Sequence, residues 1–569
     1  MKFKVHSRLR EDMTGFRISL VCMLAAGLIN NFSPPLTAQE NWKEVKVYSG
    51  RIDLPTYEFT GREMEPPLFP SSTVDGEYPL PQFIRPYKPG GPSPASYDAI
   101  FLENEYLKLT VVPDLGGRIY SLYDKVNRRE VFYKNDVLKF SGVNAKGAWL
   151  VGNIELTGPH DMHMLTLKGE PYWFTRVKRH QDGSASLVIS SIDPFYRMKV
   201  NFTARLVPGL AAMELTVFCY NRRDKREPYM FWINAGVPVT RGSRFVYPMT
   251  RTIGHTTAEV ANWPYYSGVD FSWFKNNNHM LGVFGIDIYD NFLGAYDYDA
   301  DYGTFRFADR RVVTGMKTWT WGDSRYAERI TRGYTDNAGP YIEIQSGRHV
   351  WDGHYEWLIP HSYEGWSEWW FPVAGIGGFT TTSRDVALNL EVNADPQGKN
   401  SSVKIGLSAN RAMPGAVVRV VSRCGRILDT RADLAPGRPF NRTVSGIAAD
   451  SSGLTGMRVT VVDARGGEAL DYLRPDQSPG GREYTPFTRQ LEKHGKGPAE
   501  MTVEELVLDA ETKIKEMHTD AGASLLRQAL SRDSGHSRAH LNLGIMHYEQ
   551  AQRDSALVHL EQDRPRSLR

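Results

Sequence analysis

The chain has 569 residues, a formal net charge of +3 and only three cysteines. This length exceeds what one hydrophobic core supports, so three or four domains are expected. The small net charge lacks the electrostatic footprint of a protein that binds nucleic acid or an anionic membrane. Aromatic residues make up 12% of the chain and glycines number 51, which favours many strands and tight turns over helices.

Residues 1–38 have the pattern of a secretory signal. Five basic residues precede an apolar run over 18–29, and Leu36-Thr37-Ala38 offers a small-residue cleavage site. The run is too short to span a membrane, and no later stretch reaches that length, so no membrane span is expected. We expect an exported protein, periplasmic or secreted; the alternative is a buried N-terminal helix. Cleavage removes five basic and two acidic residues and leaves a neutral mature chain, which favours an uncharged partner.

A proline-rich arm and a long antiparallel domain are expected next. Residues 39–96 include ten prolines between 55 and 94 and are expected to wrap over the following domain. From 97 to 385, short alternating segments are separated by turn residues, and no segment keeps a helical period for long. This pattern predicts one large antiparallel β-domain.

The C-terminal third changes character twice. Residues 386–475 carry further strand-like segments and predict a smaller β-sandwich, and residues 476–500 form a linker rich in proline, glycine and charge. Residues 501–569 have helical spacing, and the segment 539–544 fits the small-residue contact of a tetratricopeptide hairpin. At most two such repeats fit, fewer than an array needs to stand alone. The alternative is an ordinary helical tail.

Three separated motifs resemble one known superfamily. Residues 107–125 (LKLTVVPDLGGRIYSLYDK) resemble the opening strands of galactose-mutarotase-like proteins. The motifs GMKTWTWG (315–322) and GPYIEIQSGR (339–348) resemble signatures of an exported bacterial branch of unknown function, often followed by tetratricopeptide repeats. The resemblance implies a mainly β chain: a galactose-mutarotase-like β-supersandwich, a small β-sandwich and a short tetratricopeptide-like helical tail. It leaves the reaction open, because epimerases, hydrolases and binding domains share this fold.

Tryptophans gather late in the large domain. Seven of the thirteen fall between 319 and 370, and flat rings beside hydrogen-bonding groups are typical of sugar clefts. The run 364–370 mixes carboxylates and rings without a strand period and is expected to form a loop at the cleft rim. For each ring the alternative is packing in the core. The rings predicted to contact the sugar are Trp232, Trp319, Trp321, Trp366 and Trp369.

Glu343 is the first catalytic candidate. Tyr341, Glu343 and Gln345 alternate along a strand and share its polar face. A carboxylate on such a face can act as general base or nucleophile, and the resemblance implies the same role, because mutarotases use a glutamate in a similar late strand. The alternative is an exposed strand residue paired with a lysine or arginine.

Acid–base chemistry at an anomeric centre needs a second group. Glu155, Glu368 and His160 are the candidates, and paired carboxylates suit cleavage of a glycosidic bond. Trp232 stands about where mutarotases carry a histidine that protonates the ring oxygen, which disfavours simple mutarotation. The polar residues expected to bind the sugar are Arg118, Asn234, Lys317, Gln345 and Arg348.

Neither a metal nor a cofactor is predicted. His160 and His163 are three residues apart in a loop, which is weak support for a metal without a third ligand. The two cysteines left after cleavage, Cys219 and Cys424, are expected in different domains and are interpreted as buried thiols.

These features predict an exported carbohydrate-active protein, first a glycoside hydrolase acting on oligosaccharides by carboxylate acid/base catalysis. One alternative is an aldose 1-epimerase-like sugar isomerase. The other is a non-catalytic carbohydrate-binding or assembly module whose helical tail docks a protein partner.

Overall fold

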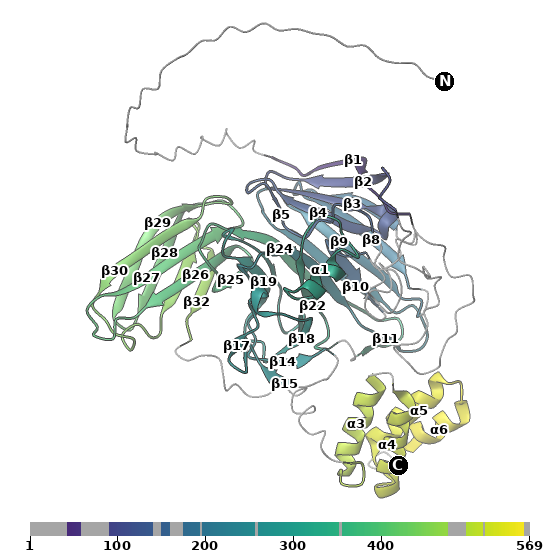
Figure 1. Ribbon diagram of the computed structural model, residues 1–569. Helices are drawn as coiled ribbons and strands as arrows, with labels where there is room; N and C mark the ends of the chain where they lie inside the picture. The colour runs from purple at the N-terminus through teal and green to yellow at the C-terminus, as the bar shows by residue number, and fades with distance from the viewer. Residues whose placement is uncertain are drawn as a thin grey trace, which may run out of the picture. The chain divides into compact units, whose positions relative to one another are not determined.

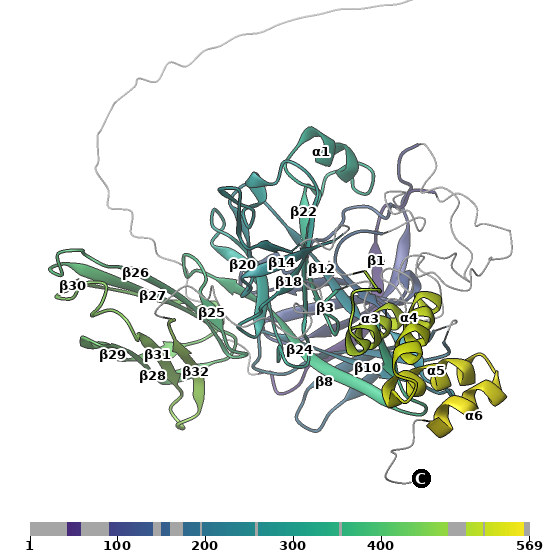
Figure 2. The same ribbon diagram turned by 90° about the horizontal axis from the view of Figure 1, so that it is seen from below.

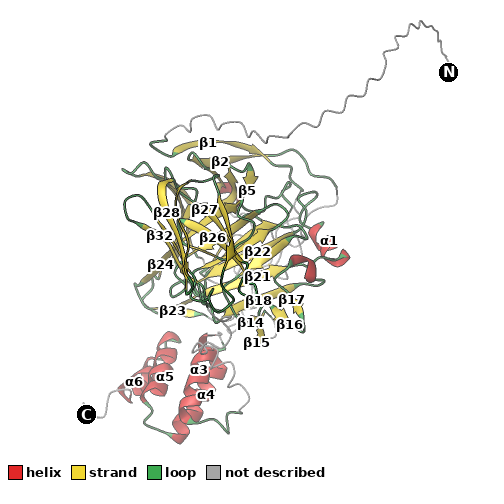
Figure 3. Ribbon diagram, turned by 90° about the vertical axis from the view of Figure 1, so that its left-hand side faces the viewer, coloured by secondary structure: helices red, strands yellow, loops and turns green. Residues whose placement is uncertain are grey.

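The computed structural model describes residues 42–58, 90–139, 150–159, 174–193, 196–255, 260–351, 355–475, 497–515 and 518–562 (Figure 1). The signal pattern, most of the proline-rich arm, His160 and His163 lie outside these ranges. No helix in the described ranges is long and apolar enough to cross a membrane. Strands dominate the described chain, which confirms the mainly β prediction (Figure 3).

Two antiparallel sheets form the first sandwich. The larger sheet has twelve described strands: β1 (Lys46–Asp53), β2 (Ser96–Glu103), β3 (Leu107–Val112), β4 (Arg118–Asp124), β6 (Ile154–Thr157), β12 (Trp232–Pro238), β22 (Tyr341–Gly347), β21 (Gly315–Thr320), β18 (Leu281–Ile286), β14 (Arg251–Gly254) and β15 (Val260–Asn262), with β5 (Arg129–Glu130) beside β4. The other has eight: β13 (Ser243–Val246), β19 (Phe292–Asp297), β20 (Tyr302–Phe307), β24 (Tyr363–Ala374), β10 (Met213–Tyr220), β9 (Lys199–Leu206), β8 (Ala185–Ile192) and β7 (Phe174–Arg179).

Short elements flank these sheets. Two ribbons pair β11 (Glu227–Tyr229) with β23 (Glu356–Leu358), and β16 (Tyr265–Tyr266) with β17 (Val269–Asp270). A single-turn 3₁₀ helix η1 (Pro113–Leu115) joins β3 to β4, η2 (Phe274–Asn276) follows β17, and α1 (Arg325–Thr331) lies between β21 and β22.

The core of this sandwich fixes which way the central strands face. Ile342 and Ile344 of β22 and Ile233 of β12 pack in one apolar cluster with Leu215 and Val217 of the eight-stranded sheet. Because successive side chains of a strand point to opposite faces, the residues between these positions lie on the other face of the twelve-stranded sheet. Glu343 and Gln345 of β22 and Asn234 of β12 therefore point away from the space between the two sheets.

The expected rim loop at 364–370 is wrong, because this segment belongs to β24. Trp366 and Trp370 are buried in the core between the sheets. Glu368 shares their inward face, where its side chain is 0% exposed and forms an ion pair at 3.4 Å with Arg306, itself 0% exposed. The sequence does not show the usual strand pattern here, because the inward-facing side chains of β24 include the carboxylate of Glu368. Arg306, which is distant in the sequence, neutralises that charge.

A smaller β-sandwich follows. Its two layers, separated clearly in Figure 2, are β25 (Thr381–Thr382), β26 (Val386–Asn393), β27 (Ser401–Ala409) and β30 (Phe440–Ile447), and β29 (Gly425–Leu434), β28 (Met413–Ser422), β31 (Arg458–Val462) and β32 (Glu468–Leu473). They enclose a core that includes Ile405, Val418 and Val459.

The described C-terminal helices are α3 (Val503–Lys515), α4 (Thr519–Arg532), α5 (Ser537–Glu549) and α6 (Arg553–Gln562). Glycines allow close crossings: a Cβ on Gly522 would lie 2.6 Å from Ile514, and one on Gly544 would lie 2.7 Å from Leu560. The helical tail is thus present, with small residues at the α3–α4 and α5–α6 contacts.

The two described cysteines differ in environment. Cys219 is buried in the first sandwich, and burial raises the pKa of its thiol. Cys424 is exposed in the turn between β28 and β29, so its interpretation as a buried thiol is wrong. Neither is in a disulfide.

Glu227 makes the stability of the first sandwich depend on pH. Burial raises the pKa of this carboxyl to about 7 from 4.5, against the opposing charges of Lys225 and Arg223. The folded state therefore binds the proton more tightly, and stability falls as pH rises from about 4.5 to about 7. Glu227→Gln is expected to reduce this decline and to raise the unfolding midpoint at pH 8, measured by thermal scans at pH 5 and pH 8. The exposed Glu468→Gln is the control, and equal pH dependence in the two variants would contradict the assignment.

Candidate functional site

A row of polar side chains crosses the central strands on the face opposite the core. Strand register pairs Glu155 of β6 with Asn234 of β12, Asn234 with Gln345 of β22, and Gln345 with Lys317 of β21. Neighbouring members of the row are separated by one strand spacing of about 5 Å. All four are buried, with exposed fractions between 1% and 5%. The fold thus gathers, on one patch of sheet, four polar residues that are far apart in sequence.

Glu343 lies in the next row along β22, opposite Gly236 and Trp319. Its carboxylate accepts hydrogen bonds from the Tyr341 hydroxyl and from Gln345 Nε2, each at 2.7 Å. Burial, with the charge of Glu343, raises the pKa of Tyr341, so the phenol stays protonated and remains a donor. Two donors from its own strand therefore hold Glu343 in one orientation.

The glycine opposite Glu343 is required by close packing. A Cβ on Gly236 would lie 3.2 Å from the Gly152 Cα and 3.3 Å from side-chain atoms of Tyr133 and Tyr341. The absence of a side chain here leaves Glu343 without a bulky neighbour on the β12 side, whereas Trp319 lies opposite it on β21.

Arg118 is a buried cation at the β4 end of the site. Its Nη2 donates to the carbonyls of Leu150 and Gly152 at 2.7 and 2.9 Å, and so fixes the segment that leads into β6. Burial lowers the pKa of Arg118, and the charge of Glu155 opposes that shift. Arg118 and Glu155 thus stabilise each other's charged forms.

Aromatic side chains border the site at its β21 end. A Cβ on Gly282 would lie 2.5 Å from the Trp319 ring, so this glycine makes room for the indole on the neighbouring strand. The Trp319 and Trp321 rings meet edge-to-face with centroids 5.3 Å apart, and both are partly exposed. Trp321 Nε1 donates to the Tyr341 hydroxyl at 3.3 Å, which joins the indole pair to the hydrogen bonds around Glu343.

One site histidine carried no signal in the sequence. His255 follows β14, and its ring stacks on Phe284 at 5.7 Å and meets the Trp319 ring at 5.1 Å. Lys317 Nζ lies 5.0 Å from the same Phe284 ring. A lone histidine among threonines has no spacing that predicts this neighbourhood, because pairing of β14 with β18 and of β18 with β21 creates it.

Three polar atoms of the site are buried without a hydrogen-bond partner among the described residues: Arg118 Nη1, Asn234 Oδ1 and Gln345 Oε1. Leaving such an atom unsatisfied costs about 1–3 kcal/mol, and native proteins seldom do so without a reason. They include both a donor and acceptors, as a ligand rich in hydroxyl groups would require.

Four predicted residues lie elsewhere. Trp366 and Glu368 face the core between the sheets, so the backbone of the twelve-stranded sheet separates them from Glu343. Trp369 lies on the opposite face of β24, where Arg384 approaches its ring at 5.9 Å. Arg348 forms an ion pair with Glu364 of β24 and is absent from the polar row. The sequence predicted these residues in one cleft with Glu343 because they are close to it in the chain. The three residues of β24 are apart from it in the structure because β24 belongs to the eight-stranded sheet and β22 to the twelve-stranded sheet.

Trp232 occupies an intermediate position. It shares the face of Asn234, yet it is 0% exposed and packs with Phe284 and Tyr355. Its ring lies against the bare backbone of Gly315 and Gly347, where a Cβ would approach it to 2.7 and 2.6 Å. In this structure its side chain packs within the protein beside the site and offers no surface to a ligand.

Two family models match the chain. Residues 73–373, more than half of the chain, match the family model described as Domain of unknown function (DUF5107). Residues 381–472 match the model described as YphG-like protein, second domain.

Among solved structures, a TPR-domain containing protein from Parabacteroides distasonis ATCC 8503 superposes with a TM-score of 0.52 at 24% identity. That match covers 58% of this chain and 55% of the other, so this chain matches about half of its length and shares its fold. A putative aldose 1-epimerase from Klebsiella pneumoniae subsp. pneumoniae MGH 78578 matches at 11% identity with a TM-score of 0.36, over 49% of this chain and 80% of that one. A galactose mutarotase-like protein from Clostridium acetobutylicum matches at 10% identity with the same TM-score, over 49% and 96%.

Proposed function

The chain belongs to the family described as Domain of unknown function, DUF5107, and from its site we propose that it binds a neutral saccharide and acts on the anomeric centre with Glu343 as base. The proposed binding surface, called the polar sheet face, is the face of the twelve-stranded sheet that carries Glu155, Asn234, Lys317, Glu343 and Gln345. The observation that carries the proposal is the set of buried, unpartnered atoms on Arg118, Asn234 and Gln345. Sugar hydroxyls both donate and accept hydrogen bonds, so a saccharide offers the kind of partner that each of the three atoms lacks.

The charges of the site support an uncharged ligand. Arg118 and Lys317 offset Glu155 and Glu343, so these four side chains sum to zero formal charge. A phosphorylated or acidic sugar would bring a charge with no excess cation to meet it. The partly exposed indoles of Trp319 and Trp321 supply flat apolar faces for the C–H side of a pyranose.

Isomerisation of an aldose at its anomeric carbon is the reaction that this geometry supports best. Glu343 is oriented by two donors and acts as the base that removes the anomeric hydroxyl proton. The sequence argued against this reaction because the expected histidine is absent. His255, however, supplies an imidazole 5.1 Å from the Trp319 ring, and Lys317 Nζ lies 5.6 Å from the same indole. His255 acts as the acid that protonates the ring oxygen as the bond between that oxygen and C1 breaks. Rotation about C1–C2 and reclosure of the ring, with both proton transfers reversed, give the other anomer.

Hydrolysis of a glycosidic bond is the second candidate, and Glu155 is the observation that favours it. Two carboxylates, Glu155 and Glu343, share this buried face. Their strands are two apart and the residues are two positions out of row, so standard strand spacing places their Cα atoms about 12 Å apart. Side chains that lean towards each other from this Cα distance come within the wide carboxyl separation of inverting enzymes, about 6.5–9.5 Å, more readily than within the close separation of retaining ones. In this case we expect inversion.

His255→Gln and Glu155→Gln separate the two reactions. An isomerase is expected to lose about 10²-fold in anomer interconversion with His255→Gln, measured by NMR exchange spectroscopy on a panel of neutral aldoses. A hydrolase is expected to lose a similar factor in reducing-sugar release with Glu155→Gln. If both variants bind sugar and the parent turns over nothing, the protein is a binding module and both reactions are excluded.

Asn234→Ala tests the binding face itself. Removal of one buried amide that contacts a sugar hydroxyl is expected to weaken saccharide binding about tenfold, the equivalent of 1.4 kcal/mol. Isothermal titration of the parent and variant measures this change. Asn201→Ala, on the eight-stranded sheet, is the matched control. Equal affinities in the Asn234 and Asn201 variants would place the sugar elsewhere.

We also propose that the protein is exported and that its helical tail docks a protein partner. The basic and apolar pattern of residues 1–38 supports export. The close glycine crossings at Gly522 and Gly544 support a tetratricopeptide-like pairing of α3 with α4 and of α5 with α6.

A further inference from the structure

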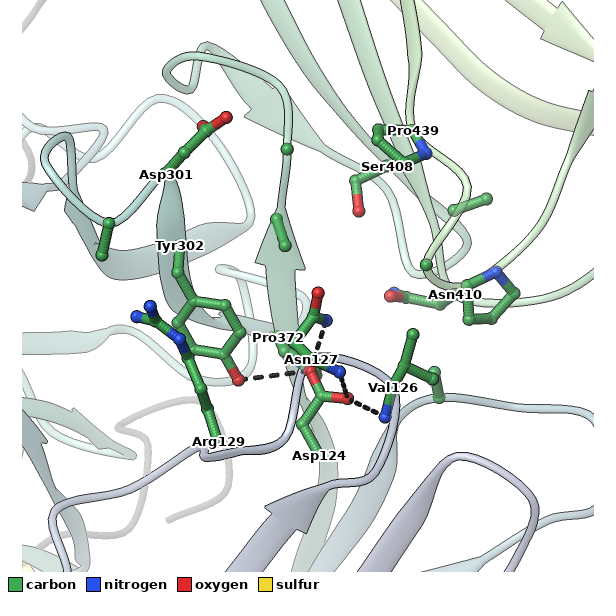
Figure 4. A pocket seen from close by; sticks show the side chains of 17 residues that line it. Asp124, Val126, Asn127, Arg129, Asp301, Tyr302, Pro372, Ser408, Asn410 and Pro439 are labelled. Carbon is green, nitrogen blue, oxygen red and sulfur yellow. Dashed lines mark hydrogen bonds between the residues drawn. The ribbon is translucent and has the colours of Figure 1, made fainter. Parts of the chain in front are cut away.

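A cavity of about 350 Å³ lies where the first sandwich meets the second (Figure 4). Its walls come from the turn after β4, the start of β20, the end of β24 and strand β27. Figure 4 shows Tyr302 and Asn127 on one side and Ser408 and Asn410 on the other, facing a common space. Its volume lies near the lower end of the range for small-ligand sites.

The two carboxylates in the wall are already engaged. Asp124 accepts the backbone N–H groups of Val126 and Asn127 at 2.9 and 3.1 Å, the Asn127 side-chain amide at 2.7 Å and the Tyr302 hydroxyl at 3.3 Å. Asp301 Oδ1 accepts the Gly377 N–H at 2.7 Å and the Tyr296 hydroxyl. These contacts shape the turns and argue against a cavity built to hold a cation.

The groups left to meet a ligand are mostly uncharged. Ser408 makes no side-chain hydrogen bond within the described ranges, and Asn410 uses its Nδ2 on the Arg384 carbonyl at 2.8 Å, which leaves its oxygen as an acceptor. The Arg129 guanidinium lies 5.5 Å from the Tyr302 ring centroid and forms no ion pair with a described residue. Pro372, Pro436 and Pro439 supply apolar wall.

We propose that this cavity is a second binding site for a neutral saccharide, separate from the polar sheet face. Hydroxyl, amide and guanidinium groups set among proline surface and an aromatic side chain match the alternating hydroxyls and C–H faces of a sugar ring. The choice of ligand class rests on the proposed function. Two sugar sites on one chain allow a single glycan, or two ends of it, to be held by more than one contact, which raises its effective affinity.

Filling the cavity tests the proposal. Ser408→Tyr places a ring in the space without removing a described hydrogen bond, and Ser402→Tyr, six residues earlier on the same face of β27, is the matched control. Both changes are made in the Asn234→Ala background, so that binding at the polar sheet face is weakened about tenfold. Maltotriose, cellotriose and xylotriose are titrated separately, and thermal unfolding confirms that each variant is folded.

Binding of at least one trisaccharide is expected to persist in the Asn234→Ala background, to fall about tenfold or more with Ser408→Tyr and to be unchanged with Ser402→Tyr. If Ser408→Tyr does not fold, the exposed Arg129→Ala replaces it, with an expected loss of a few-fold. The proposal is overturned if the background variant binds none of the three sugars, or if blocked and control variants bind alike. The proposal for the polar sheet face is tested separately. It is overturned if Asn234→Ala, made alone in the otherwise native chain, binds saccharide with the affinity of the parent.

Discussion

Glu343→Gln is expected to lower turnover of the saccharide substrate by about 10²-fold or more, the lower end of what a general base contributes. The amide keeps the size of the carboxylate but cannot accept a proton. The fold is expected to tolerate the change, because Gln345 can turn its unpartnered Oε1 towards the new amide. Anomer interconversion and reducing-sugar release, measured on the same preparations, report the loss whichever reaction operates.

The control for this variant is Glu214→Gln, on the eight-stranded sheet, which removes a carboxylate of the same size far from the polar row. Its turnover is expected to match the parent. A Glu343→Gln variant that is folded, binds the sugar and retains full turnover would exclude Glu343 as the base.

Glu368→Ala is expected to cost the first sandwich about 3–5 kcal/mol of unfolding free energy, the usual loss when one partner of a buried ion pair is removed. The remaining guanidinium of Arg306 is fully buried, and burial lowers its pKa while Glu368 opposes the shift. The Trp366 N–H, which donates to Glu368 at 3.0 Å, also loses its acceptor. Denaturant unfolding followed by tryptophan fluorescence measures the change.

A charge-free pair provides the matched test. Arg306→Met combined with Glu368→Leu removes both ions and is expected to recover most of the stability, because no buried charge is left unpaired. Turnover of this double variant is expected to stay close to that of the parent. A large loss of turnover with recovered stability would indicate that Glu368 takes part in catalysis, as the sequence predicted.

The local periodicity of the sequence was informative where a strand has one apolar face. The alternation of Tyr341, Glu343 and Gln345 with isoleucines places the polar set on one face of β22, as the structure shows. The same reasoning failed at Trp366 and Glu368, because the inward face of β24 holds a carboxylate that only Arg306, some sixty positions earlier, makes tolerable. Periodicity cannot identify a strand whose buried face is itself charged.

The residues of the polar row are brought together by the order of strands in the sheet, and the local sequence pattern does not predict that order. Glu155, Asn234 and Lys317 become neighbours of Gln345 because β6, β12, β22 and β21 are adjacent in the sheet. His255 enters through two further pairings, β14 with β18 and β18 with β21. The resemblance to galactose-mutarotase-like proteins pointed to several of these residues, but their mutual placement required the topology.

The most direct test of the central claim is to map where a saccharide contacts the protein, using the indole N–H signals of the tryptophans in a titration followed by NMR. Trp319→Phe and Trp321→Phe assign the two signals that lie at the polar sheet face. The account predicts that a bound sugar shifts these two signals while those of Trp366 and Trp370, buried between the sheets, stay in place. Shifts confined to other tryptophans, or none at all with a sugar shown to bind, would contradict it.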